Sequence, residues 1–269
     1  MKLLFIGGGN MALAMIGGLL KRGWQTADIT AVDIAPEARD RLTRATGVRA
    51  VATPAEGSAG ADCIVFAVKP QQLKATATAF APLLAGRLVI SIAAGIRSAD
   101  LARWLNGHER IVRAMPNTPA LVLAGMSGLY ARPAVNAEDR AAAESVLAAA
   151  GATLWLAREE EIDGITAVSG SGPAYVFYFI EALEAAALAQ GFDAAAARQL
   201  ALQTFAGAVK LAAESDEPPA VLRARVTSKG GTTERGVGVL EARGLKAVVD
   251  EAVTAAAGRS RELGDELGR

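Results

Sequence analysis

The sequence predicts an α/β amino-terminal part, built on a doubly wound parallel sheet, followed by an all-α carboxyl-terminal part. Short aliphatic runs alternate with longer segments of helical pattern up to about residue 156, and no convincing strand pattern follows Glu159. A glycine-rich turn also follows the first aliphatic run. Such alternation is typical of βαβ crossovers, which place parallel strands in one sheet with helices on both faces. We expect one domain over residues 1–157 and a second over residues 158–269.

The aliphatic runs of the first part predict buried strands, because each is short and is bounded by turn residues. Strands are expected at residues 2–6, 29–32, 63–67, 88–92 and 110–114, and helices at residues 11–22, 37–46, 71–84 and 98–106. Weaker patterns near residues 127–130 and 153–156 predict two further strands that extend the sheet.

The second part predicts helices only, punctuated by Gly191 and by a pair of prolines. They are expected at residues 174–190, 193–213, 219–226, 233–241 and 245–267. The stretch YVFYFIEALEAAALAQG is apolar around much of its circumference, so this helix should be buried in a core or in a subunit interface. We therefore expect a dimerisation domain and a homodimer or higher homo-oligomer. The alternative is that these helices pack only on each other and on the first domain.

Composition narrows the function classes. The 28 basic and 28 acidic residues cancel, so no field of one sign favours nucleic acid or an anionic membrane as a partner. No segment reaches the roughly 20 apolar residues that a membrane span needs. Cys63 is the only cysteine, which favours a cytoplasmic protein, and its apolar neighbours predict a buried, inert thiol. A small-molecule substrate fits this balance, and no metal site is expected.

The turn FIGGGNMALA carries Gly7, Gly9 and Ala12 in the G-x-G-x-x-A register. It follows an expected strand and opens an expected helix, which is the context of the Rossmann dinucleotide fingerprint. The first glycine permits the tight turn, the second lets the backbone approach a pyrophosphate, and the small alanine lets helix and strand pack. The pyrophosphate would then lie on the free N–H groups of the helix N-terminus.

Asp33 ends the second expected strand, about 20 residues beyond the fingerprint. An acid at this position binds the adenosine ribose hydroxyl and repels a 2′-phosphate, which favours NADH over NADPH. Arg39 and Arg41 follow closely and could reach a phosphate, so both cofactors stay open. The alternative role for Asp33 is that of an N-cap for the helix over residues 36–46.

Later strand ends add small residues where a bound cofactor would lie, because ligands of open α/β sheets bind outside the carboxyl ends of the strands. The motifs are AVKP, SIAAG and MPNTPA, in which Asn117 offers an amide to the nicotinamide region and Lys69 either faces the cofactor or is solvated. The predicted cofactor residues are Gly7, Gly8, Gly9, Asn10, Met11, Ala12, Asp33, Ala67, Val68, Lys69, Pro70, Ala93, Ala94, Gly95 and Asn117.

An obvious base for alcohol oxidation is missing. The only histidine, His108, lies in a loop away from every motif, and Lys210 has no supporting asparagine four residues on. Reduction of a C=N bond needs no such base, because its basic nitrogen can be protonated before hydride arrives. The protein then has to supply only orientation and hydrogen bonds. Two loops of the second part, residues 168–175 and 226–236, are rich in Ser, Thr and Gly and suit a carboxylate. Simple helix capping is the alternative role of both.

The motifs FIGGGNM, AVKP, SIAAG, RAMPNTPAL, AVSGSGPAYV and VTSKGGTTE, in this order, resemble the pyrroline-5-carboxylate reductase family over essentially the whole chain. The resemblance implies reduction of 1-pyrroline-5-carboxylate to L-proline with NADPH or NADH, the last step of proline synthesis, and an interlocking helical dimer. It also implies a substrate site at Ser228, Gly231, Thr232 and Thr233, with Thr233 as the catalytic residue at the ring nitrogen.

Two positions depart from the family pattern. Lys229 stands where many members have Pro, and Asp33 stands where NADPH-preferring members tend to have a neutral or basic residue. The alternatives to this family are a related hydroxy-acid dehydrogenase or imine reductase, and a non-catalytic dinucleotide-sensing protein. The Ser/Thr/Gly-rich loops argue against a sensor, which has no need of a second carboxylate site.

Overall fold

The computed structural model describes all 269 residues and divides them into two compact units. The first unit comprises Met1–Ser171 together with Ala255–Arg269, and the second comprises Gly172–Thr254. The last part of the chain thus belongs to the first unit, which no local sequence pattern indicates. The domain boundary expected at residue 157 stays a prediction.

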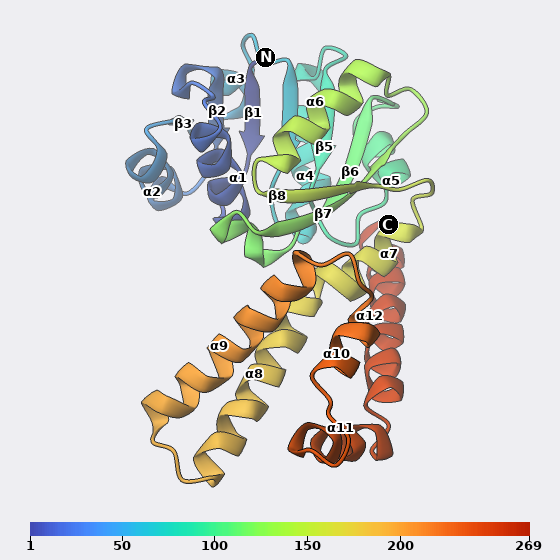
Figure 1. The fold of residues 1–269 in the computed structure, drawn as a ribbon. Coiled ribbons are helices and arrows are strands. Elements are labelled where there is room, and N and C mark those ends of the chain that lie inside the picture. Colours follow the sequence, from blue (N-terminus) through green and yellow to red (C-terminus); the bar gives the residue numbers. More distant parts are fainter. The chain divides into compact units, whose positions relative to one another are not determined.

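The first unit is built on one eight-stranded sheet in the order β3-β2-β1-β4-β5-β6-β7-β8 (Figure 1). The first six strands follow the order of a Rossmann sheet, which confirms the fold class. All neighbours pair in parallel except β6 and β7, so the sheet is mixed rather than wholly parallel. The strands are β1 (Leu3–Ile6), β2 (Ile29–Val32), β3 (Arg49–Val51), β4 (Cys63–Phe66), β5 (Leu88–Ser91), β6 (Ile111–Met115), β7 (Gly125–Ala131) and β8 (Gly151–Trp155).

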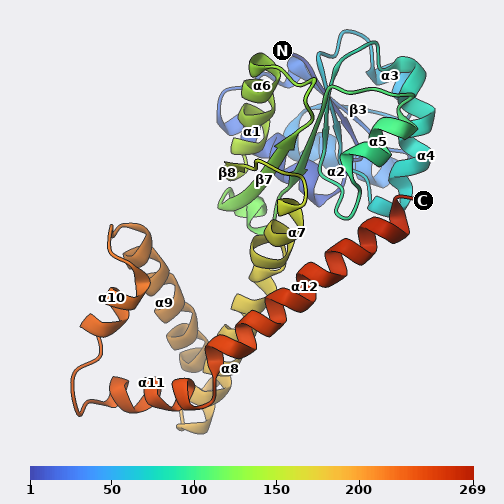
Figure 2. The same ribbon diagram turned by 90° about the vertical axis from the view of Figure 1, so that its right-hand side faces the viewer.

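Helices of the first unit cover both faces of this sheet. One core packs α1 (Asn10–Lys21) and α6 (Ala137–Ala148) on one face, and a second core packs α4 (Pro70–Phe80) and α5 (Ser98–Trp104) on the other (Figure 2). Leucines, isoleucines and Phe5 or Phe66 on alternate strand positions fill the two cores, so the central strands β1, β4 and β5 are buried on both sides. The remaining helices are α2 (Pro36–Thr46), α3 (Pro54–Gly57) and α7 (Glu161–Ile165), with 3₁₀ turns at Thr26–Asp28, Ala81–Leu83 and Thr118–Val122.

The parallel register places the functional loops at one edge. Phe5 pairs with Val65 and Val65 with Ile90, so β1, β4 and β5 end side by side. Residues following these strands, and those following β2 and β6, therefore gather at the carboxyl edge, where open sheets of this order bind ligands.

The segment at residues 168–175 is helical, so its expectation as a loop was wrong. A π-helical turn over Thr166–Gly170 follows α7 directly, and α8 (Gly172–Ala189) begins after Ser171 alone. The π-turn closes with the Ser171 N–H donating to the Thr166 carbonyl at 2.8 Å, one residue wider than in an α-helix.

The second unit is wholly helical, as expected. It consists of α8, α9 (Ala194–Ala213), α10 (Pro219–Arg225), α11 (Thr232–Ala242) and the first part of α12 (Leu245–Leu267), up to Thr254. Helices α8 and α9 pack against each other, yet Val176, Phe177 and Tyr178 of α8 remain exposed. None of the helices is both long and apolar enough to cross a membrane.

Candidate dinucleotide and substrate sites

Gly7 forms the turn that joins the first strand to α1. Its φ is +107°, and a Cβ at this position would lie 2.7 Å from the Ala67 carbonyl oxygen and 2.9 Å from the Val68 nitrogen. Its N–H donates to the Val32 carbonyl at 2.7 Å. Only glycine fits both the conformation and the close approach. The structure therefore brings together two loops that the sequence predicted separately, those after β1 and β4.

The N-terminus of α1 has the features that a pyrophosphate requires. Gly9 is the N-cap, it is exposed, and nothing lies within 4 Å of a Cβ built on it. No side chain caps the helix and no acidic residue lies in its first turn. The first N–H groups of this helix are thus free for an anion, and the residues present fit a dinucleotide here.

Asp33 holds the glycine turn rather than capping α2. Its carboxylate accepts hydrogen bonds from the Gly8 N–H at 2.7 Å and from the Ala35 N–H at 2.9 Å. The N-cap of α2 is Ala35, without a side-chain hydrogen bond, so the capping alternative for Asp33 was wrong.

The two nearby arginines are also bound to this region. Arg39 donates to the Asp33 and Ile34 carbonyls at 2.8 and 3.0 Å, and Arg41 donates to the Gly8 carbonyl at 3.1 Å. One carboxylate and two guanidinium groups thus surround the end of β2. This arrangement suits a ribose hydroxyl and also leaves cations within reach of a 2′-phosphate.

The predicted loops after β4 and β5 differ in exposure. Lys69 is exposed and forms the N-cap of α4, whose first turn begins with Pro70. By contrast, Gly95 is buried with a φ of +72°, and a Cβ on it would lie 3.2 Å from the Leu263 Cβ of α12. Gly95 therefore permits the end of α12 to pack closely against the loop after β5 within the first unit, a requirement that the sequence did not indicate.

Asn117 follows β6 and is bound at both ends of its amide. Its Oδ1 accepts from the Met126 N–H at 2.8 Å, and its Nδ2 donates to the Ser169 carbonyl at 2.9 Å. A backbone N–H can only donate and a carbonyl can only accept, so the Met126 N–H and the Ser169 carbonyl fix the orientation of the Asn117 amide. One N–H of the amide remains for a ligand, so only part of the amide that the sequence offers to the nicotinamide region is available.

The predicted substrate residues lie at the start of α11. Gly231 is the N-cap, without a side-chain cap, and Thr232 and Thr233 form the first turn. Ser228, Thr232 and Thr233 are exposed, and their hydroxyls make no hydrogen bond within the chain. A Cβ on Gly231 would lie 3.0 Å from the Ser228 carbonyl oxygen, so the compact turn favours glycine here.

One acidic side chain shares this turn with the predicted substrate residues. Glu234 accepts from the Gly230 N–H at 2.7 Å, and the Gly231 N–H donates to the Ser228 carbonyl at 3.0 Å. The N–H groups of Thr232 and Thr233 stay unpaired because they are in the first turn of the helix. The turn thus offers three free hydroxyls and two unpaired N–H groups to a small carboxylate.

Residues considered for other chemistries are placed away from these loops. Lys210 is exposed on α9 and pairs with Glu214 at 3.9 Å. His108 is half-buried and contacts the Arg110 carbonyl at 3.3 Å. Cys63 is buried in the core, as expected, and burial raises the pKa of its thiol, which favours the unreactive protonated form.

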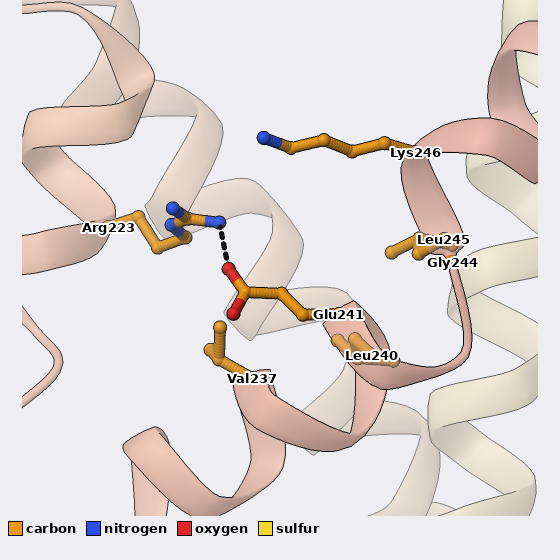
Figure 3. A pocket seen from close by; sticks show the side chains of 7 residues that line it. All are labelled: Arg223, Val237, Leu240, Glu241, Gly244, Leu245 and Lys246. Carbon is orange, nitrogen blue, oxygen red and sulfur yellow. Dashed lines mark hydrogen bonds and ion pairs between the residues drawn. The ribbon is translucent and has the colours of Figure 1, made fainter.

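The second unit also holds an open pocket of about 380 Å³ that contains none of the predicted site residues. It lies between α10, α11 and the start of α12 (Figure 3). Arg223 and Glu241 point toward one another across it, with 3.0 Å between their charged atoms, and the rest of its lining is mostly aliphatic. The pocket is therefore separate from the candidate site, because no predicted site residue lines it.

The strand order and the glycine turn together define the class of dinucleotide-binding Rossmann proteins, and comparison with known proteins narrows the class. Residues 159–263 match the family model for pyrroline-5-carboxylate reductase dimerisation. Residues 2–95 match a model described as NADP oxidoreductase, coenzyme F420-dependent.

Whole-chain relatives agree with the first of these models. The chain is 45% identical over 269 residues to the pyrroline-5-carboxylate reductase of Pseudomonas aeruginosa, covering 100% of this chain and 98% of that one. A pyrroline-5-carboxylate reductase structure from Coxiella burnetii superposes with a TM-score of 0.93 at 39% identity, covering 97% and 98%. The Plasmodium falciparum pyrroline carboxylate reductase with NADP bound superposes with a TM-score of 0.86 at 31% identity, covering 98% of each chain. The chain belongs to the pyrroline-5-carboxylate reductase family.

Proposed function

We propose that the protein reduces 1-pyrroline-5-carboxylate to L-proline with NADPH or NADH, the final step of proline biosynthesis. The observation that carries this proposal is the 45% identity to a pyrroline-5-carboxylate reductase along the entire chain. Two anion-suited helix N-termini, those of α1 and α11, support it, because the reaction needs one place for a pyrophosphate and one for a carboxylate.

The reduction breaks the C=N π bond of the ring. A reduced nicotinamide held by the loops described above would supply the hydride that the imine carbon takes up, and a proton from solvent on the ring nitrogen completes the secondary amine. The loops at Gly7–Ala12, Ala67–Pro70 and Ala93–Gly95 hold the dinucleotide through backbone atoms, with Asn117 at the nicotinamide end. Asp33 contributes through the glycine turn that it fixes.

The residues of the α11 turn act on the substrate. Ser228, Gly231 and Thr232 bind its carboxylate through hydroxyls and N–H groups. Thr233 places its hydroxyl at the ring nitrogen, where a hydrogen bond orients the C=N bond for hydride transfer.

We further propose that the chain acts as a homodimer or a larger homo-oligomer. The match to the dimerisation model supports self-association, as does the exposure of Phe177 and Tyr178, which are 65% and 71% accessible in the single chain. Large apolar side chains in such a cluster mark an interaction surface. Light scattering should give at least twice the monomer mass, and Phe177→Asp should lower it. A monomeric wild-type chain at assay concentration would refute self-association.

The direct test of the function is a rate measurement with 1-pyrroline-5-carboxylate and each reduced cofactor, followed by detection of proline. We expect proline to form in a one-to-one ratio with oxidised cofactor. Cofactor binding without any such turnover would refute the proposal and favour a sensing role.

A further inference from the structure

A proline lies in the second position of α8 and leaves one carbonyl of the preceding turn without its helical partner. In an α-helix the Ser169 carbonyl would accept from the N–H of Pro173, four residues on, but proline has no N–H. The chain is nevertheless helical on both sides of this point. The missing donor must come from elsewhere in the fold, because an unpaired carbonyl in a half-buried turn is costly.

Asn117 supplies that donor. Its Nδ2 lies 2.9 Å from the Ser169 oxygen, and the other end of its amide is bound to the Met126 N–H at 2.8 Å. The turn also lies directly against the end of β6, since a Cβ on Gly170 would be 3.0 Å from the Met115 Cε. The π-turn is therefore fixed to the carboxyl edge of the sheet, where the dinucleotide loops end.

The turn distinguishes two serines that look equivalent in the sequence SGSG. The Ser169 hydroxyl donates to the Ile165 carbonyl at 3.2 Å and is thus occupied, as is the Thr166 hydroxyl, which donates to Ile162 at 2.8 Å. The Ser171 side chain is half-buried and its hydroxyl has no partner in the chain. Among these hydroxyls, only that of Ser171 is available to a ligand.

We propose that Asn117 is a positioning residue for the reduction, which acts through the Ser169 carbonyl to set the π-turn and so presents the Ser171 hydroxyl to the bound reactants. The inference rests on the proposed function. Asn117 thus has a role beyond its amide contact to the nicotinamide. The SGSGP sequence forms the turn that Asn117 holds, and this turn carries the Ser171 hydroxyl. Pro173 excludes the ordinary helical hydrogen bond and makes the turn depend on the loop after β6.

The test begins with Asn117→Asp, which keeps the acceptor for Met126 but replaces the donor with an oxygen facing the Ser169 carbonyl. We expect kcat to fall by about tenfold or more while the dinucleotide Kd stays within about threefold. Asn136→Asp is the matched control, because Asn136 uses only its Oδ1, as the N-cap of α6, and aspartate caps equally well. Its kcat should stay at the wild-type value.

Two further comparisons separate positioning from folding. Ser171→Ala should lower kcat and Ser169→Ala should not, and adding Ser171→Ala to Asn117→Asp should cause little further loss, because both changes remove one function. If Asn117→Asp folds poorly, Asn117→Ala is used, and Pro173→Ala in that background should restore part of the turnover by returning an N–H to the Ser169 carbonyl.

The inference is overturned if Asn117→Asp lowers the Tm while kcat and KM stay unchanged. It is also overturned if the effects of Asn117→Asp and Ser171→Ala on kcat multiply independently. Absence of wild-type turnover would refute the proposed function and this inference together, whereas normal wild-type turnover with an unaffected Asn117 variant refutes the inference alone.

Discussion

A pair of glycine substitutions separates folding from cofactor binding in the fingerprint turn. In Gly7→Ala the new methyl group would lie 2.7–2.9 Å from the backbone of Ala67 and Val68, at a φ of +107°. Backbone strain of this kind costs about 1–3 kcal/mol, and overpacking costs about 1–3 kcal/mol more. Neither neighbouring atom can move aside, because both are main-chain atoms next to a central strand.

The sum lowers the free energy of unfolding of the first unit by about 2–6 kcal/mol. A central value of about 4 kcal/mol lowers the Tm by about 8–16 °C, at about 2–4 °C per kcal/mol for a chain of this size class. Circular dichroism during heating measures the change directly, and cofactor binding should weaken as well because the turn is displaced.

Gly9→Ala is the matched control, since the position has a φ of −71° and nothing within 4 Å of the new methyl group. Its only folding cost is a poorer N-cap, about 1 kcal/mol at most. The methyl group would stand where the pyrophosphate approaches, so the dinucleotide Kd should rise by about tenfold or more, equivalent to about 1.4 kcal/mol. Equal losses of Tm in the two variants, or unchanged cofactor binding in Gly9→Ala, would refute the assigned geometry.

Three further predictions concern charge and chemistry. Asp33→Asn keeps one acceptor for the glycine turn but removes the charge, so the ratio of kcat/KM with NADPH to that with NADH should rise about tenfold; an unchanged ratio would leave Asp33 with only its structural role. Thr233→Val should lower kcat about 100-fold with unaltered cofactor affinity. Thr227→Val is its control and should leave kcat unchanged, because the Thr227 hydroxyl donates to the Arg223 carbonyl. Burial lowers the pKa of His108 below its usual value near 6.5, so the folded chain binds fewer protons there and stability should fall as the pH drops below about 6.5. His108→Gln should flatten this part of the Tm profile, and an unchanged profile would contradict the assignment.

The main strands and helices were predictable because their signals are local. Runs such as LLFI and CIVF are wholly buried, and the helices of the second unit start and end near glycine or proline. The short strand β3 was missed because its three residues, RAV, include only one that is buried. Helix α6 was missed because it is rich in alanine, whose weak hydrophobicity gives little periodic signal.

Other features depend on contacts between distant residues. The antiparallel direction of β7 follows from the chain path after β6, and an apolar run indicates no direction. The SGSGP sequence has the Gly and Pro content of a loop, yet it is helical because Asn117, some 50 residues earlier in the chain, supplies the donor that proline lacks. The need for glycine at position 95 appears only when α12 packs on it.

The two predicted sites share one feature, a glycine at the N-cap of a helix, which is visible in both the sequence and the structure. Among the helices with a defined N-cap, only α1 and α11 begin at a glycine. Glycine brings no side-chain acceptor of its own, so the first N–H groups stay open to an external anion, whereas Asn136 and Asp193 occupy them in α6 and α9. The free turn of α1 has no acidic residue and suits the two charges of a pyrophosphate. In α11, the Glu234 carboxylate is bound by the Gly230 N–H, and the hydroxyls of Ser228, Thr232 and Thr233 supplement the free amides as hydrogen-bond donors, which suits a small carboxylate. The start of α1 therefore suits the pyrophosphate of a dinucleotide, and the start of α11 suits the carboxylate of a small imino acid.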